Sequence, residues 1–120
     1  MKKILLAEGN IAEARERSRA LCGFTQGERY AQVLRDLAPA LTVDVYNLPE
    51  LGPLPRHVLD GFDGVVLTGS ALQIYEDRAE VHRQIAFARD VFDAGMPFFG
   101  SCWGLQVATV AAGGEAGLNH

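Results

Sequence analysis

The fold can be read outward from one segment near the end of the chain, residues 97–106, with the sequence PFFGSCWGLQ. It begins with a short apolar run between a proline and a glycine, which predicts a buried strand. The residues from Leu105 to Ala112 are small and apolar, which favours a helix packed on that strand. Cys102 therefore stands at a strand-to-helix turn, where unpaired N–H groups and the helix dipole favour a thiolate. Gly100 and Gly104 permit the tight, strained backbone that lifts a nucleophile clear of a sheet.

Earlier segments of the chain predict further strands and helices. Short apolar or β-branched runs predict strands at residues 3–7, 42–46 and 62–67. Helical spacing of apolar residues predicts helices at residues 28–38, through Tyr30, Val33, Leu34 and Leu37, and 78–94, through Val81, Ile85, Ala88 and Phe92. Residues 8–27 have a weak apolar stripe broken by Gly23 and Gly27, so we expect an irregular crossover with a helical turn or two. The proline-rich residues 49–55 predict an irregular connection.

Strands and helices alternate along the chain, which predicts right-handed parallel crossovers. The expected fold is α/β, a three-layer, doubly wound, mostly parallel sheet of the flavodoxin-like type, in a single domain over residues 1–120. The last six residues, 115–120, predict no further strand. Because a four-stranded doubly wound sheet is small, we expect this domain to lack its C-terminal part.

The composition restricts the class of protein and its partners. The chain has 48% hydrophobic residues, 22% charged residues and a net charge of -4, as in soluble globular proteins. It has no basic cluster, which argues against nucleic acid as a partner. No stretch is apolar for long enough to cross a bilayer, and the run that stops at Glu8 is too short for a signal peptide. With two cysteines and no export signal, we expect a cytoplasmic protein without a structural disulfide.

Gly69, after the third predicted strand, is a second candidate functional residue. Ligands of open parallel sheets bind beyond the carboxyl ends of the strands, and Gly69 would lie beside Cys102 if the third and fourth strands are neighbours. The backbone N–H groups of Gly69 and Trp103 could then point at one oxygen, as in an oxyanion hole. The implied reaction is acyl transfer through a thioester on Cys102. Cys22 lacks such a setting, and we expect it to be a small structural residue.

The segment from Gly100 to Gln106 resembles the nucleophile motif G-x-C-x-G-x-Q of the class I, or triad-type, glutamine amidotransferases. Residues 63–70, DGVVLTGS, look like the oxyanion strand and loop of that family. Residues 74–77 and 113–114 are similar to the corresponding parts of members related to the amidotransferase domain of GMP synthetase. The resemblance extends from about the first strand to the last residue and is weakest in residues 8–27.

This resemblance implies that Cys102 attacks the side-chain amide of L-glutamine, releasing ammonia and then, after hydrolysis of the thioester, glutamate. It implies that Gly69 and Trp103 are the oxyanion donors. The positions matched to the glutamine pocket are Ser70, Gly104 and Gln106. Gln106 offers both a donor and an acceptor to a zwitterionic amino acid, although a packing role is also open. A synthetase domain or subunit would accept the ammonia, and no cofactor is implied.

The general base of the family is missing from these residues. Its His-x-Glu pair lies far downstream of the cysteine, and nothing of that form follows Cys102 here, since His120 does not match the position. His57 follows a proline-rich segment, and His82 lies on the polar side of its predicted helix. A thiol without a base is a poor nucleophile, so we expect an enzyme in full-length form and no activity from residues 1–120 alone. No grouping has the spacing of metal ligands, so no metal is predicted.

Two alternatives stay open. The same scaffold could carry a γ-glutamyl peptide hydrolase or another cysteine hydrolase of the broader amidotransferase-like group. Without the His-x-Glu pair, the chain could also be a non-catalytic fragment, or a binding module that assembles with another chain.

Overall fold

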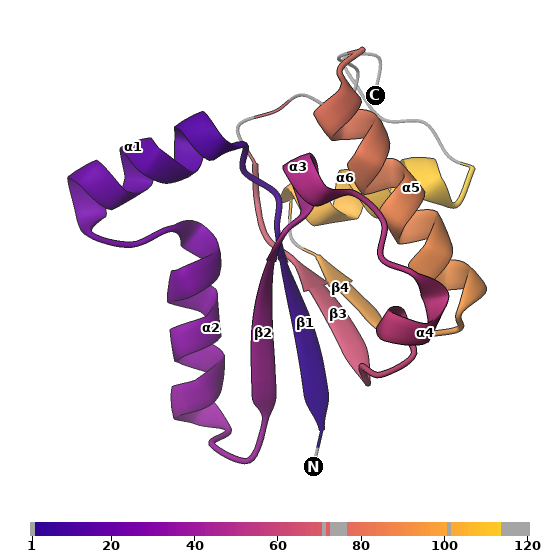
Figure 1. Cartoon of the computed structure of the whole chain (residues 1–120), viewed down its shortest axis with the longest axis horizontal. Coiled ribbons are helices and arrows are strands. Elements are labelled where there is room, and N and C mark those ends of the chain that lie inside the picture. Colours follow the sequence, from indigo (N-terminus) through magenta and orange to yellow (C-terminus); the bar gives the residue numbers. More distant parts are fainter. Residues whose placement is uncertain (1, 71, 73–76, 101, 114–120) are drawn as a thin grey trace.

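The computed structural model describes residues 2–70, 72, 77–100 and 102–113. Its strands form one parallel sheet in the order β2-β1-β3-β4, which is seen obliquely in Figure 1. Their bounds are Lys3–Glu8 (β1), Thr42–Asn47 (β2), Gly64–Leu67 (β3) and Phe98–Gly100 (β4). The helices are α1 (Ala12–Cys22), α2 (Gln26–Leu37), α3 (Leu48–Leu51), α4 (Arg56–Leu59), α5 (Ala79–Asp93) and α6 (Cys102–Ala111).

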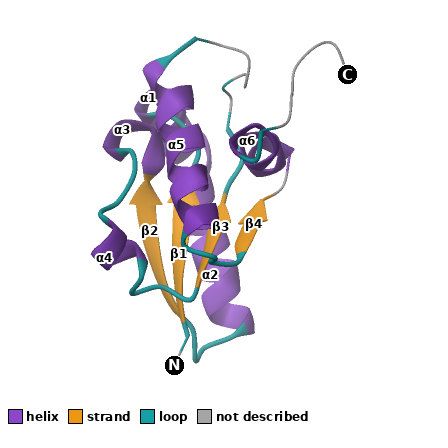
Figure 2. Cartoon of the chain, turned by 90° about the vertical axis from the view of Figure 1, so that its right-hand side faces the viewer, coloured by secondary structure: helices purple, strands orange, loops and turns teal. Residues whose placement is uncertain are grey.

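The sheet separates two apolar clusters, because successive side chains of a strand point to opposite faces. Leu5 and Ala7 of β1 belong to the larger cluster, under α3, α4, α5 and α6. Leu6, between them, belongs to the smaller cluster under α2. Figure 2 shows α5 in front of the strands and α2 behind them. The predicted three-layer, doubly wound α/β fold is confirmed.

The first and last strands differ in burial. The end of β1 is covered on both faces, since Leu5, Leu6 and Ala7 are buried, as predicted for a strand inside a parallel sheet. The prediction of a buried fourth strand is wrong in part. Phe99 is 78% exposed, because β4 is the edge strand and no described element covers its α2-side face.

The first crossover is more regular than expected. Residues 8–27 contain the whole of α1, which has 11 residues and none of them buried. It extends away from the sheet at the upper left of Figure 1. Arg15 attaches it to the body through an ion pair with Glu50 and a 2.7 Å hydrogen bond to the carbonyl of Asn10. The helix ends at Gly23, with φ of 86°. Because α1 is held by polar contacts, its sequence needs no apolar stripe. Hydrophobic periodicity therefore predicts only a helical turn or two in this segment.

The start of α2 shows why Gly27 does not interrupt this helix. Thr25 and Glu28 form a capping box, in which each side chain accepts the backbone N–H of the other residue. The helix therefore begins at Gln26, before the predicted residue 28. Gly27 is helical and lies against β1, since a β-carbon there would be 3.3 Å from the carboxylate of Glu8.

Replacing Thr25 by Ala should lower the free energy of unfolding by about 1 kcal/mol, because the first turn of α2 loses its cap. The Thr25 N–H and then Arg19 favour the charged form of Glu28 and hold the pKa of this carboxyl below its ordinary value. The stabilisation from the Glu28 carboxylate, which accepts the backbone N–H of Thr25, is thus present at neutral pH and is lost as the pH falls through the lowered pKa. Denaturant titration at two pH values measures both effects. Ser18→Ala on α1 is the control, with a change expected within about 0.5 kcal/mol.

The apolar stripe of α2 is only partly buried, which corrects the prediction. Leu37 is 78% exposed, and Tyr30 and Val33 are also exposed. The helix packs on the sheet through buried Ala31 and half-buried Leu34. The remaining stripe faces a part of the sheet that no described element covers.

The later connections also differ from expectation in detail. The proline-rich connection, expected to be irregular, contains the short helices α3 and α4. Helix α5 starts and ends within a residue of its predicted bounds, and Gly95 follows it with φ of 67°. Its buried face includes Phe87 and Val91 rather than Phe92, which is 39% exposed. Helix α6 begins at Cys102, three residues before the predicted 105.

Candidate functional site

The loops after β1, β3 and β4 meet at the carboxyl edge of the sheet. The three strands are parallel neighbours, and Leu67 of β3 pairs with Gly100 of β4. The turn Thr68-Gly69 and the first residues of α6 therefore leave the sheet side by side. The predicted proximity of Gly69 and the Cys102 turn is confirmed.

The strand-to-helix turn is closely packed at its two glycines. A β-carbon on Gly100 would lie 2.7 Å from the Cα and carbonyl carbon of Gly104. A β-carbon on Gly104 would lie 3.0 Å from the carbonyl oxygen of Leu67. Neither glycine has a positive φ, so neither is required for a left-handed conformation, and residue 101 of the turn lies outside the described residues. Glycine is needed because α6 and β4 approach each other and β3 without room for a side chain.

Cys102 is the first residue of α6, and Trp103 follows it. The backbone N–H groups in the first turn of a helix have no partner within the helix, so the main chain here can donate to an anion. The indole of Trp103 is 3% exposed, and its Nε1 donates to Oε1 of Gln84 at 2.7 Å. The sequence predicts a role only for the backbone N–H of Trp103, and no local pattern indicates this side-chain contact.

The predicted pocket residues have different surroundings. A β-carbon on Gly69 would lie 3.3 Å from the side-chain amide of Gln26. The hydroxyl of Ser70 accepts the N–H of Leu72 at 3.1 Å. Gly104 is buried and packs on β3, whereas Gln106 is exposed on α6. Of these residues, Gln106 therefore presents its side chain most openly.

A buried chain of polar groups links the three loops, and we refer to it as the Glu8 network. Its members are Glu8, Gly9, Gly27, Thr68, Gln84 and Trp103. The side chains of Glu8, Thr68 and Gln84 are fully buried. No buried side-chain polar atom of the described residues lacks a partner. The signal for this network in the sequence is a carboxylate directly after an all-apolar strand and followed by glycine, a pattern that by itself predicts only the end of the strand.

Neither of the two histidines that the structure describes bonds to the Glu8 network. His57 is exposed on α4, and His82 is exposed on α5, where it contacts Oδ1 of Asp77 at 2.7 Å. His120, residues 74–76 and Gly114 lie outside the described residues. No group of three or more His, Cys, Asp or Glu in the described ranges could hold a metal ion. Cys22 is exposed, so the expectation of a packed structural cysteine is wrong. Within the same ranges, none of the helices has the length and apolar character to span a membrane.

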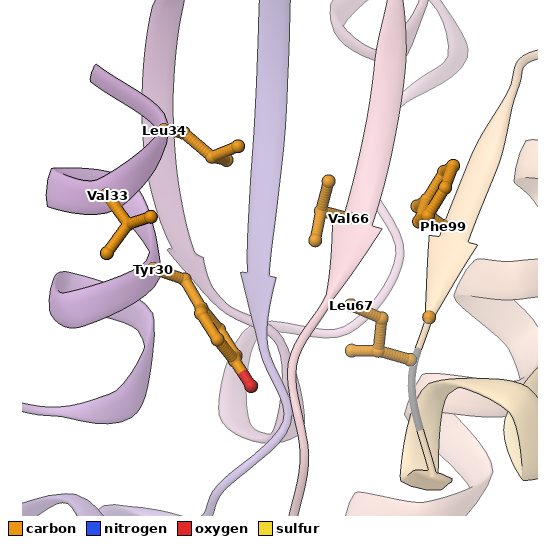
Figure 3. A pocket seen from close by; sticks show the side chains of 7 residues that line it. Tyr30, Val33, Leu34, Val66, Leu67 and Phe99 are labelled. Atoms are coloured by element: carbon orange, nitrogen blue, oxygen red, sulfur yellow. The ribbon is translucent and has the colours of Figure 1, made fainter. Parts of the chain in front are cut away.

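Two hollows adjoin the edge. A polar hollow of about 450 Å³ is lined by Asn10, Ser18, Phe24, Gln26, Arg29 and Tyr30. An apolar groove of about 280 Å³ lies between α2 and β4 and is lined by Tyr30, Val33, Leu34, Val66, Leu67, Phe99 and Gly100. Tyr30 belongs to both, and its hydroxyl points toward the loops that follow β1 and β3 (Figure 3). The polar hollow is the one whose side chains can satisfy a polar ligand.

Comparison with known proteins places the chain in a family. Residues 26–119 match the family described as "Glutamine amidotransferase class-I". The chain is 35% identical over 113 residues to a gamma-glutamyl-L-1-hydroxyisopropylamide hydrolase from Pseudomonas sp. That match covers 94% of the chain and 38% of the hydrolase.

Two further proteins are similar over shorter or more divergent stretches. A GMP synthase [glutamine-hydrolyzing] from Streptomyces avermitilis is 26% identical over 88 residues, which are 73% of the chain and 16% of the synthase. The solved glutaminase domain of CTPS from Trypanosoma brucei, with bound acivicin, has a TM-score of 0.56 and 21% identity over 92% of the chain. The chain spans 40% of that structure, and the likeness supports the fold. With its sheet, its strand-to-helix turn and this family match together, the chain belongs to the class I glutamine amidotransferase family.

Proposed function

We propose that this chain is the nucleophile-bearing part of an enzyme that hydrolyses the side-chain amide of glutamine. The observation that carries the proposal is the position of Cys102, which starts α6 beside the Thr68-Gly69 turn. A helix N-terminus favours the thiolate form of a cysteine and provides backbone N–H donors. Thiolate and donors together suit attack on an amide carbonyl.

The reaction proceeds in two stages. The sulfur of Cys102 bonds to the amide carbonyl carbon, and the N–H groups of Gly69 and Trp103 stabilise the oxyanion that forms. The C–N bond breaks as the nitrogen takes up a proton, and ammonia leaves. Water then attacks the glutamyl thioester, which releases glutamate and restores the thiol. Each oxyanion donor contributes about 3 kcal/mol to transition-state stabilisation in enzymes of this kind.

The glutamine pocket is built around the start of α6. Gln106 contributes a donor and an acceptor for the amino-acid end of the substrate, and Ser70 borders the pocket from the oxyanion turn. Gly104 acts through packing, because it lets α6 lie close enough to β3 for this geometry. The general base is a His-x-Glu pair outside the described residues, since neither His57 nor His82 has a glutamate two positions later. A synthetase domain or subunit receives the ammonia.

A second substrate class is supported by one comparison and one feature. The Pseudomonas relative, at 35% identity, is named for a γ-glutamyl amide with a hydroxyisopropyl group. The polar hollow borders Gly69 through Gln26, which gives room for a substituent on the amide nitrogen. On this alternative the enzyme releases a small amine instead of ammonia.

Comparing L-glutamine with N-hydroxyalkyl γ-glutamyl amides on the full-length protein tests both candidates. A kcat/KM at least about tenfold higher for glutamine supports the glutaminase, since tenfold corresponds to about 1.4 kcal/mol of selectivity. The reverse ratio supports the γ-glutamyl amide hydrolase and removes the need for an ammonia acceptor. Absence of turnover with both substrates contradicts the enzymatic proposal and favours a binding module.

A further inference from the structure

We infer that Glu8 is a positioning residue for the oxyanion site, acting on Thr68-Gly69 directly and on Trp103 through Gly9 and Gln84. The inference rests on the proposed function, because it assigns these residues to the geometry of that reaction. Glu8 lies at the end of β1 and has no place among the residues that touch the substrate.

The carboxylate of Glu8 is fully buried and bonded on both oxygens. Oε1 accepts the N–H of Gly27 at 2.9 Å, and Oε2 accepts the hydroxyl of Thr68 at 2.8 Å. A buried carboxylate is costly unless its oxygens are satisfied. The N–H of Gly27 belongs to the first turn of α2, where a negative charge is favourable. The carboxylate therefore joins α2, β1 and the turn after β3.

Glu8 determines which acceptor receives the proton of the Thr68 hydroxyl. The N–H of Gly9 donates to Oγ1 of Thr68 at 2.9 Å, so this hydroxyl already accepts a bond. Its single proton has two acceptors within reach, Oε2 of Glu8 at 2.8 Å and the carbonyl of Gly69 at 3.2 Å. The shorter, charge-assisted bond to Glu8 is the stronger one. The carboxylate thus keeps the hydroxyl away from the Gly69 carbonyl.

The same chain of bonds reaches the strand-to-helix turn. Nε2 of Gln84 donates to the carbonyl of Gly9 at 3.2 Å, and Nε1 of Trp103 donates to Oε1 of Gln84 at 2.7 Å. A β-carbon on Gly9 would lie 2.9 Å from Cδ1 of Trp103 and 3.0 Å from the carbonyl oxygens of Thr68 and Gly69. Gly9 is therefore in close contact with both halves of the proposed oxyanion site. A shift on either side is transmitted to the other.

The substitution Glu8→Gln keeps the size of the side chain and removes its ability to accept on both ends. If the amide nitrogen faces Thr68, the hydroxyl must turn to the carbonyl of Gly69. If it faces Gly27, two donors oppose each other at the start of α2. The first arrangement acts on the Gly69 turn directly, and the second pushes residue 8 away from α2 and so shifts its contact with Thr68. Small displacements of catalytic groups cost up to about 100-fold in rate. We expect kcat to fall about 10- to 100-fold while KM changes less than about threefold.

The control is Glu28→Gln, the same change in an exposed carboxylate at the same end of α2. It leaves the Glu8 network intact, and we expect kcat and KM close to those of the wild type, with at most the small loss of stability that a weaker cap of α2 causes. An unchanged kcat in Glu8→Gln, with the wild type active, overturns the positioning role. A parallel fall of kcat in both variants also overturns it, because the cause would then be a loosened helix.

A second pair of variants covers the case in which Glu8→Gln does not fold. Thr68→Val removes the hydroxyl at nearly the same volume, and Thr68→Ser restores it. We expect Thr68→Val to lower kcat about tenfold or more and Thr68→Ser to keep at least about a third of it. Equal kcat values in these two variants contradict the inference.

A readout independent of turnover separates this inference from the proposed function. Trp103 is the single tryptophan of these residues, and its indole N–H can be followed by NMR in the full-length protein. Faster hydrogen exchange at this N–H in Glu8→Gln, but not in Glu28→Gln, supports the network even if no γ-glutamyl amide is hydrolysed. Unchanged exchange in Glu8→Gln overturns it.

Discussion

Replacing Cys102 by Ser should reduce amide hydrolysis by the full-length protein at least about 10⁴-fold. Loss of the nucleophile in a hydrolase of this mechanistic type removes most of the rate enhancement, and the remainder comes from binding and from the oxyanion donors. A serine hydroxyl has a far higher pKa than a thiol and is not ionised by a helix N-terminus alone. Glutamate release, measured under saturating substrate, checks the expectation.

The chain offers a matched control in Cys22→Ser. Cys22 is exposed at the end of α1, away from the carboxyl edge of the sheet, and its replacement should leave kcat and KM unchanged. Turnover retained by Cys102→Ser would falsify the proposed nucleophile. Equal losses in both variants would instead indicate that thiol chemistry elsewhere controls the activity.

Replacing Gly100 by Ala should destabilise the fold by about 1–3 kcal/mol and abolish activity. The added carbon would lie 2.7 Å from backbone atoms of Gly104, and backbone cannot move aside as a flexible side chain can. Overpacking of a well-packed region costs this much in free energy of unfolding. The first turn of α6 must then move away from β4, which displaces Cys102 and Trp103. Denaturant unfolding and the amide hydrolysis assay measure the two effects.

Gly64→Ala provides the same chemical change in the neighbouring strand β3. Its nearest atom would be Cδ1 of Ile4 at 3.4 Å, which is an ordinary contact with the end of a side chain. We expect its free energy of unfolding to stay within about 1 kcal/mol of the wild type. A Gly100→Ala protein as stable and active as Gly64→Ala would show that the turn has more room than its distances indicate.

The two candidate substrates differ in the substituent on the amide nitrogen. Glutamine and γ-glutamyl amides share the carbonyl that Cys102 would attack, so the proposed oxyanion donors Gly69 and Trp103 would serve both equally. They differ in the leaving group, and the hollow lined by Gln26, which lies beside Gly69, is the proposed space for a larger one. Substitution in that hollow, for example Arg29→Ala, is therefore expected to change the preference between amides more than the rate with glutamine.

The sequence by itself was sufficient to predict the strands, the fold class and the strand-to-helix turn at Cys102. An all-apolar run such as residues 4–7 is typical of a strand that is covered on both faces of a parallel sheet. A cysteine between Gly100 and Gly104 after an apolar run predicts a strand-to-helix turn, and the structure has one. These features are local, because periodicity and the steric demands of glycine act over a few residues.

Only the tertiary structure decided which apolar side chains are buried, because burial depends on residues that are distant in the sequence. Phe99 is exposed because β4 is the edge strand, and strand order is a property of the whole sheet. The stripe of α2 was correctly predicted as helical, but its burial depends on which strands lie beneath it.

The strand-to-helix turn itself shows the same division. From the sequence, Gly100 and Gly104 were expected to serve an unusual backbone conformation. In the structure they serve a close approach between α6, β4 and β3. Single hydrogen bonds of the Glu8 network join residues up to 75 positions apart in the chain, and no local pattern could reveal them. Sequence determined which groups are present, and only the packing of three loops at one edge decided which of them meet, because hydrogen bonds form within about 3 Å whatever the separation along the chain.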